Sequence, residues 1–85
     1  MNIELRFFAS VREQLGLGQE RVAVPATVAT VGELRQWLGT RGGAWAEVLA
    51  EGRALRMAVD HEVAGAGSAL AEGCEVAFFP PVTGG

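Results

Sequence analysis

Apolar residues recur at helical spacing along one main segment of this chain. They stand three and four residues apart, which places them on one face of a helix, at Val31, Leu34, Trp37 and Leu38. The sequence Thr30-Val31-Gly32-Glu33 has the form of a capping box, so the helix is predicted to begin there and to end at Gly42-Gly43. One apolar stripe of this kind is most economically buried against one face of a sheet.

The segments around this helix have the patterns of strands. Alternation of apolar and charged residues over positions 3–7 is typical of a half-buried strand. Further strands are predicted at 21–25, 55–59, 63–64 and 74–79, with a turn at 60–62. A short helix is predicted to open with a capping box at Ser10 and to stop at Gly16 or Gly18, and another short helical segment covers 44–50. The predicted class is therefore α+β, and the first two strands form a hairpin-like pair.

Length and composition limit the function. A chain of 85 residues holds one small core, which leaves no room for a deep cleft with a full catalytic apparatus. The net charge is −3, and the seven basic residues, all arginine, form no basic block, so no nucleic-acid partner is expected. No apolar run reaches membrane-spanning length, and Glu4 and Arg6 interrupt any signal-like opening, so no membrane partner is expected. The single cysteine excludes an internal disulfide, and the simplest location is the cytoplasm.

The sequence offers no side-chain constellation for catalysis or for metal binding. His61 and Cys74 lie in different predicted elements without the spacing of metal ligands, so no metal site is expected. His61 is interpreted as a solvated turn residue and Cys74 as a small buried hydrophobe. The chain is therefore expected to have no catalytic centre of its own.

The last eight residues, Phe-Phe-Pro-Pro-Val-Thr-Gly-Gly, carry a clearer functional signal. A stiff Pro-Pro limits the entropy lost when a tail threads a channel, and terminal glycines keep the approach uncrowded. Residues 80–85 reach about 20 Å when extended. We expect a globular body over residues 1–79 and a flexible tail over residues 80–85, with the carboxylate of Gly85 as the working group.

Strand alternation predicts an apolar patch at the root of this tail. Phe79 shares a face of the last strand with Glu75, and Phe8 follows the face of Glu4 and Arg6, so both aromatic side chains are expected to be exposed. If the first and last strands are neighbours, Phe8 and Phe79 lie together, and Val63 can join them. A contiguous exposed apolar surface usually marks a partner site.

Several segments together resemble the small, sulfur-carrying subunit of molybdopterin synthase. They are the tail, the sequence Phe7-Phe8-Ala9-Ser10-Val11-Arg12-Glu13, the helix with Leu34-Arg35-Gln36, and the strand that ends at Phe79. The resemblance covers essentially the whole chain. It implies a ubiquitin-like β-grasp fold, in which a mixed sheet is packed on one main helix with short extra helices. The chain departs from the family chiefly in its glycine-rich loops and at residues 26–29.

The resemblance also implies a mechanism and its partners. An activating enzyme adenylates the carboxylate of Gly85 with ATP, and a sulfur donor, such as a cysteine desulfurase or a rhodanese-type protein, converts it to a thiocarboxylate. The tail then enters the large subunit of the synthase, in an expected heterotetramer, and gives sulfur to cyclic pyranopterin monophosphate on the route to the molybdenum cofactor. The chain itself is expected to bind no cofactor.

The family pattern assigns a role to each matching residue. Gly85 carries the sulfur and Gly84 gives clearance. The residues expected to line the channel are Pro80, Pro81, Val82 and Thr83. The patch on which the activating enzyme and the large subunit dock corresponds to Phe8, Val63 and Phe79, with Arg12 adding a polar contact near the tail root.

Three other functions stay open at this stage. The chain is alternatively a sulfur carrier for thiamin or cysteine synthesis, although the Phe-Phe-Pro-Pro-Val-Thr stretch argues against this. A ubiquitin-like modifier of target lysines shares the same activation step. A plain binding module, in which the Gly-Gly end is incidental, is the remaining alternative.

Overall fold

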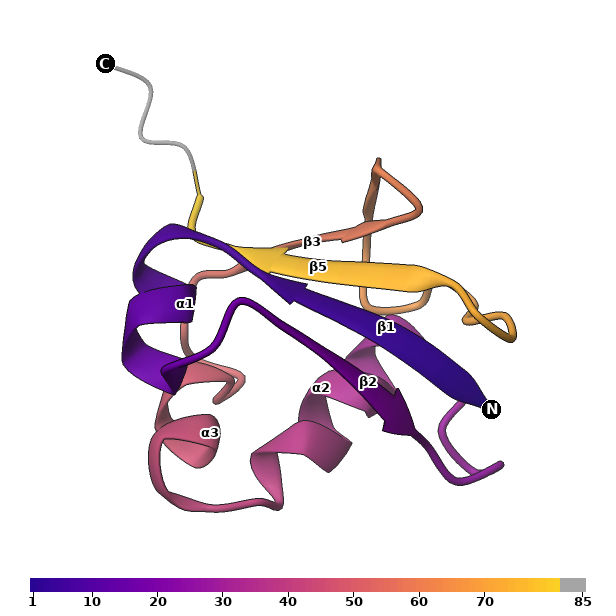
Figure 1. The fold of residues 1–85 in the computed structure, drawn as a ribbon, viewed down its shortest axis with the longest axis horizontal. Coiled ribbons are helices and arrows are strands. Elements are labelled where there is room, and N and C mark those ends of the chain that lie inside the picture. Colours follow the sequence, from indigo (N-terminus) through magenta and orange to yellow (C-terminus); the bar gives the residue numbers. More distant parts are fainter. Residues whose placement is uncertain (82–85) are drawn as a thin grey trace.

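The computed structural model describes residues 1–81 and consists of one sheet with helices on one side (Figure 1). The strands are β1 (Asn2–Phe7), β2 (Gln19–Ala23), β3 (Arg56–Val59), β4 (Glu62–Ala64) and β5 (Glu75–Phe79). The helices are α1 (Ala9–Leu15), α2 (Val31–Gly39) and α3 (Gly43–Val48). The order of elements is the one that the sequence predicts. None of the helices in residues 1–81 has the length and hydropathy needed to cross a bilayer.

The sheet is mixed, with the order β2-β1-β5-β3-β4. The first and last strands, β1 and β5, are parallel neighbours at its centre, whereas the other pairs are antiparallel. The hairpin of β1 and β2 is the pair predicted from the sequence. A mixed sheet of this order, crossed on one face by α2, is the β-grasp arrangement that the resemblance implies (Figure 1).

The core lies between the sheet and α2. The inward positions of the central strands are fully or almost fully buried, at Ile3, Leu5, Phe7, Val76 and Phe78. The helix contributes Val31, Leu34 and Leu38, which have no exposed surface, while Trp37 is half-buried against the same cluster. Cys74 is buried and free, as expected of a small hydrophobe. The helical stripe thus fills one face of the sheet, because its spacing matches the inward row of the strands.

The capping box of α2 is present as predicted. The Thr30 hydroxyl accepts a hydrogen bond from the Glu33 backbone N–H, and the Glu33 carboxylate accepts from the backbone N–H groups of Thr30 and Ala29. These hydrogen bonds lower the pKa of Glu33, and the bond from the Ala29 N–H has the largest effect. The helix ends at Gly39, earlier than predicted, and Gly42 caps α3, so Gly43 belongs to the next helix and not to a stop.

The predicted capping box at Ser10 is wrong. The N-cap of α1 is Phe8, whose backbone is extended, and no side chain caps this helix. The Phe8 N–H donates to the carbonyl of Phe78 at 3.2 Å, which holds Phe8 beside β5, and the helix begins at the next residue, Ala9, earlier than a cap at Ser10 predicts. The predicted stop at Gly16 is confirmed, since Gly16 adopts a left-handed conformation (φ 80°) and closes the helix.

Arg35 joins α2 to the segment between α3 and β3. Its guanidinium donates to the carbonyl oxygens of Leu49, Ala50 and Arg53 at 2.8, 2.5 and 2.8 Å. Burial lowers the pKa of this group, an effect that the charge of Glu51 opposes. Arg35, which the sequence analysis named only as part of a family motif, thus anchors the irregular segment between α3 and β3. This segment has few hydrogen bonds of its own.

Candidate functional site

The root of the tail is the C-terminal end of β5, at the centre of the sheet. Phe78 has no exposed surface and stacks on Phe7 of the parallel neighbour, with 5.9 Å between the ring centroids. Trp45 of α3 also packs against Phe7, edge to face, with 5.5 Å between the ring centroids. The strand therefore ends in a tightly held aromatic cluster, and the position at which Pro80 and Pro81 leave the body is fixed by the core.

The described residues of the tail are Pro80 and Pro81, both half-exposed. The other predicted tail residues, Val82, Thr83, Gly84 and Gly85, lie outside the described residues. The division into a body over 1–79 and a flexible tail over 80–85, and the channel-lining and sulfur-carrying roles, stay predictions.

Phe8 and Phe79 extend from neighbouring strands on the outer face of the sheet. Because Phe7 pairs with Phe78, the next residue of each strand points to the face opposite the core. Phe8 is 44% exposed, as predicted. The prediction that Phe79 is exposed is wrong in degree, since this side chain is half-buried. The central position of β5 explains the difference, because Phe79 has Arg56 of β3 opposite it and Phe8 of the other neighbour beside it.

Val63 lies on the same outer face, on the edge strand β4. It pairs with Ala58 of β3, which in turn pairs with Ala77 of β5. Val63 is 75% exposed, whereas both alanines are buried. The strand register thus places an apolar row between Val63 and the two aromatic residues. We call this surface the outer-face patch and define it by Phe8, Val63, Phe79, Ala58 and Ala77.

The two alanines of the outer-face patch were not identified from the sequence. Their small side chains on neighbouring strands keep the row flat between Val63 and Phe79. A signal was available, since Ala58 and Ala77 occupy outward positions of their strands where a polar residue is usual. The alternation of each strand alone does not reveal that the two positions are opposite each other, because that depends on the order of the sheet.

A tight turn presents Val63 at the end of its hairpin. Asp60 and His61 form a two-residue connection between β3 and β4, and both have positive φ angles, 48° and 72°. Hairpins with two-residue loops favour such angles. The Asp60 carboxylate accepts a hydrogen bond from the Glu75 N–H at 3.0 Å, which ties the turn to β5. The His61 side chain is largely exposed and lies 3.6 Å from the Glu75 carboxylate, so the prediction of a solvated turn residue is confirmed.

Arg12 of α1 lies beside the outer-face patch. It is exposed, and it lines with Phe8 and Arg6 a surface hollow of about 280 Å³. Its side chain crosses Gly18, where an added Cβ atom would come within 3.0 Å of the Arg12 Nε atom. The structure thus brings together the predicted docking residues Phe8, Arg12 and Phe79, with Val63 farther along the same face.

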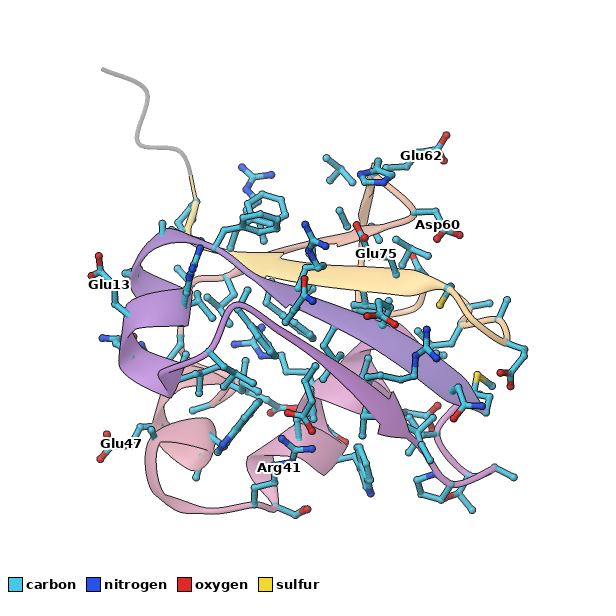
Figure 2. The ribbon with its side chains drawn as sticks, viewed as in Figure 1. Glu13, Arg41, Glu47, Asp60, Glu62 and Glu75 are labelled. Atoms are coloured by element: carbon cyan, nitrogen blue, oxygen red, sulfur yellow. The ribbon has the colours of Figure 1, made fainter. Side chains whose placement is uncertain are left out.

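The described residues supply a surface for a partner and a root for a tail. Among residues 1–81, no group of three or more histidine, cysteine, aspartate or glutamate side chains is arranged to hold a metal ion. Of the acidic residues labelled in Figure 2, Glu13 and Glu47 lie apart on the helical side, whereas Asp60, Glu62 and Glu75 lie near one another at the other end of the sheet. This arrangement suits docking on another protein through the outer-face patch, which lies next to the start of the tail.

The chain is similar to known proteins over its whole length. The model of the ThiS family matches residues 5–85. The molybdopterin synthase sulfur carrier subunit of Escherichia coli (strain K12) is 43% identical over 83 residues, which are 98% of this chain and 99% of that protein.

Solved structures share the fold. SAMP1 of Haloferax volcanii has a TM-score of 0.77 and 30% identity, with each chain covered completely. In the complex of subunits 1 and 2 of molybdopterin-converting factor from Helicobacter pylori 26695, a chain matches with a TM-score of 0.67 and 23% identity, again with complete coverage, and this likeness shows the fold alone. The sequence match to nearly all of the E. coli subunit confirms the resemblance stated from the sequence. The chain belongs to the ThiS family and is a relative of the molybdopterin synthase sulfur carrier subunits.

Proposed function

We propose that this chain is the sulfur carrier subunit of a molybdopterin synthase. The observation that carries this proposal is the 43% identity to the E. coli sulfur carrier subunit over 98% of the chain. The geometry of the body supports it, because the outer-face patch adjoins the point where the tail leaves the sheet. A partner that docks on the patch receives the tail at a defined place.

In the proposed reaction the C-terminal carboxylate of Gly85 is activated in another protein. A carboxylate is ionised at neutral pH and is a poor electrophile. An activating enzyme joins it to AMP from ATP, which releases pyrophosphate and gives the acyl carbon a leaving group. A persulfide on the sulfur donor, a cysteine desulfurase or a rhodanese-type protein, then displaces AMP and forms an acyl disulfide. A second thiol cleaves the S–S bond, which releases the thiocarboxylate and leaves a disulfide on the donor side.

The large subunit is the proposed site of sulfur transfer. The thiocarboxylate is a sulfur anion and a good nucleophile towards cyclic pyranopterin monophosphate, and two such donations supply the two sulfur atoms of the dithiolene. The chain acts as a donating subunit, in a proposed heterotetramer with the large subunit. We further propose that it works in the cytoplasm, where a free thiol such as that of Cys74 is kept reduced.

The first test is the intact mass of the chain after incubation with its activating enzyme, ATP and a sulfur source. We expect one C-terminal oxygen to be replaced by sulfur. Deletion of Gly85, or addition of one residue after it, is expected to abolish both the mass change and dithiolene formation with the large subunit. Both variants are expected to keep the melting temperature, because Gly85 follows the last residue of β5 by six positions in sequence. Sulfur transfer that survives either change would contradict the proposal.

A protein modifier is the second candidate function, because the likeness to Haloferax volcanii SAMP1, a small archaeal modifier protein, reaches 30% identity over the whole chain. The two functions share adenylation and differ in the acceptor. Conjugates between Gly85 and lysines of cellular proteins would favour the modifier, whereas dithiolene formation with the large subunit favours the sulfur carrier. The chain has no lysine, so a modifier of this sequence could not be linked into chains through its own lysines.

A further inference from the structure

The arginine residues of the chain fall into two groups. Four have partners within the body: Arg21 pairs with Glu4, Arg41 with Glu20, and Arg35 and Arg53 donate to backbone carbonyls. The other three, Arg6, Arg12 and Arg56, form no ion pair with a carboxylate in residues 1–81. Among residues 1–81, Arg35 and Arg53 also lack an ion pair, but backbone carbonyls hold both, whereas Arg6, Arg12 and Arg56 have neither a carboxylate nor a backbone carbonyl as partner.

These three arginines surround the root of the tail. Arg6 is the residue of β1 that pairs with Ala77, and Arg56 is the residue of β3 that pairs with Phe79, so they flank the outer-face patch on both sides of β5. Arg12 lies on α1, which follows β1 directly. Arg6 and Arg12 line the same hollow of about 280 Å³, together with Phe8 and Gln19.

Among residues 1–81, no carboxylate side chain lines this hollow. Arg6 donates through Nη1 to the neutral Gln19 amide at 3.3 Å, which leaves most of its N–H groups unused. Glu13 lies next to Arg12 in sequence and lines an adjoining hollow, which Arg12 and Gly18 also line, but it does not line the hollow of Arg6. The hollow thus presents two positive side chains, one of them half-buried, and the rim of an exposed aromatic ring.

The acidic groups of the outer face lie at the opposite end of the sheet. Figure 2 shows Asp60 and Glu62 at the β3–β4 hairpin and Glu75 near them at the start of β5, away from the C-terminal end of that strand. Glu4 pairs in register with Glu75 and forms its ion pair with Arg21, so it belongs to the same end. The sign of the charge therefore changes along the outer face of the sheet. It is positive beside the tail root and negative at the far end.

We infer that the hollow between Arg6 and Arg12 is a socket for a carboxylate side chain of the large synthase subunit. The inference rests on the proposed function, because it takes the outer-face patch as the docking surface. Phe8 belongs both to the patch and to the hollow, so a protein that covers the patch also covers the rim of the hollow. A guanidinium that loses water at an interface is costly unless the partner supplies an opposite charge. An aspartate or glutamate at the mouth of the channel meets this need and sets the orientation in which the tail enters.

Arg6→Gln tests the socket, and Arg21→Gln is the matched control. Both arginines lie on the outer face, on adjoining strands, and both substitutions change the net charge from −3 to −4. Isothermal titration with the large subunit from the same organism measures Kd for each variant. At about 50 mM NaCl we expect Arg6→Gln to weaken binding about tenfold and Arg21→Gln less than about twofold. At about 500 mM NaCl the difference is expected to shrink, because salt screens the pair. Arg6→Lys, which keeps the charge, is expected to retain most of the affinity.

Each outcome decides a different claim. Equal weakening by Arg6→Gln and Arg21→Gln would show a response to net charge and overturn the socket. No change with Arg6→Gln, in a variant whose melting temperature is that of the parent, would overturn it as well, while binding of the parent keeps the proposed function. If the parent chain itself does not bind the large subunit, the proposed function fails and the socket fails with it.

Discussion

Val63→Asp separates the docking role of the outer-face patch from the stability of the fold. Val63 lies on the edge strand β4 and is 75% exposed, the most exposed large apolar side chain among residues 1–81. An apolar side chain left in water on an edge strand contributes little to folding. If the patch binds a partner, however, this side chain is buried in the complex, and a carboxylate in its place has to lose its water.

The expected magnitudes follow from the exposed fraction. Complete burial of a valine contributes about 2 kcal/mol, so the quarter that is buried contributes about 0.5 kcal/mol. Aspartate is less favourable than valine in a strand by up to about 1 kcal/mol. The total loss of about 1.5 kcal/mol lowers the melting temperature of a domain of this size by about 6–12 °C. In the complex we expect a loss of about 2 kcal/mol or more, which weakens Kd about 30-fold or more.

The assay is titration with the large subunit and, separately, with the activating enzyme, next to a thermal melt of each variant. Ala23→Asp is the matched control, because Ala23 is exposed on the opposite edge strand β2 and the net charge changes equally. We expect the control to bind both partners as the parent does. Equal affinities for Val63→Asp and Ala23→Asp would refute the assignment of the patch. A melting temperature lowered by more than about 20 °C would show that Val63 supports the core, which would contradict the small contribution expected of an exposed side chain.

Two further predictions concern the stability of the body. Thr30→Ala removes the cap of α2 and is expected to cost about 1 kcal/mol, or about 4–8 °C in melting temperature, whereas Thr30→Ser is expected to cost much less. The hydrogen bond from Arg41 lowers the pKa of Glu20 below its usual 4.5, so the ionised form stabilises the folded chain above that pH and this stabilisation is lost as the pH falls through the lowered pKa. Urea melts at about pH 7 and about pH 3 are therefore expected to show a stability difference between the parent and Glu20→Gln that is present at the higher pH and small at the lower one; a difference independent of pH would contradict this origin.

Local patterns predicted the elements of the fold well. The capping box at Thr30 and the stripe from Val31 to Leu38 depend on residues three and four positions apart, and the structure has both. The alternation in the first strand correctly placed Phe8 on the outer face. These features are encoded within one turn or one strand, so the sequence suffices to read them.

The failures depend on contacts between distant segments. Ser10 has the sequence of an N-cap, but the parallel pairing of β1 with β5 holds Phe8 at the carbonyl of Phe78 and shifts the start of α1. Alternation predicted the correct face for Phe79 but the wrong extent of burial, because the burial of this side chain depends on the neighbouring strands β1 and β3. Arg35 donates to carbonyls 14 to 18 residues away, and no local pattern reveals such partners.

The central parallel pair explains why a small body can direct a tail. A strand at the edge of the sheet would let its end move, but β5 has a neighbour on each side and Phe78 is wholly buried against Phe7. The same pairing places Phe8 beside Phe79, so the docking surface and the tail root are parts of one rigid unit. A partner that binds the patch therefore meets the start of the tail at a fixed position, and the described body adds little to the ordering cost of the complex. On this argument a substitution that loosens the Phe7–Phe78 stack impairs delivery of the tail even where the outer-face patch is unchanged.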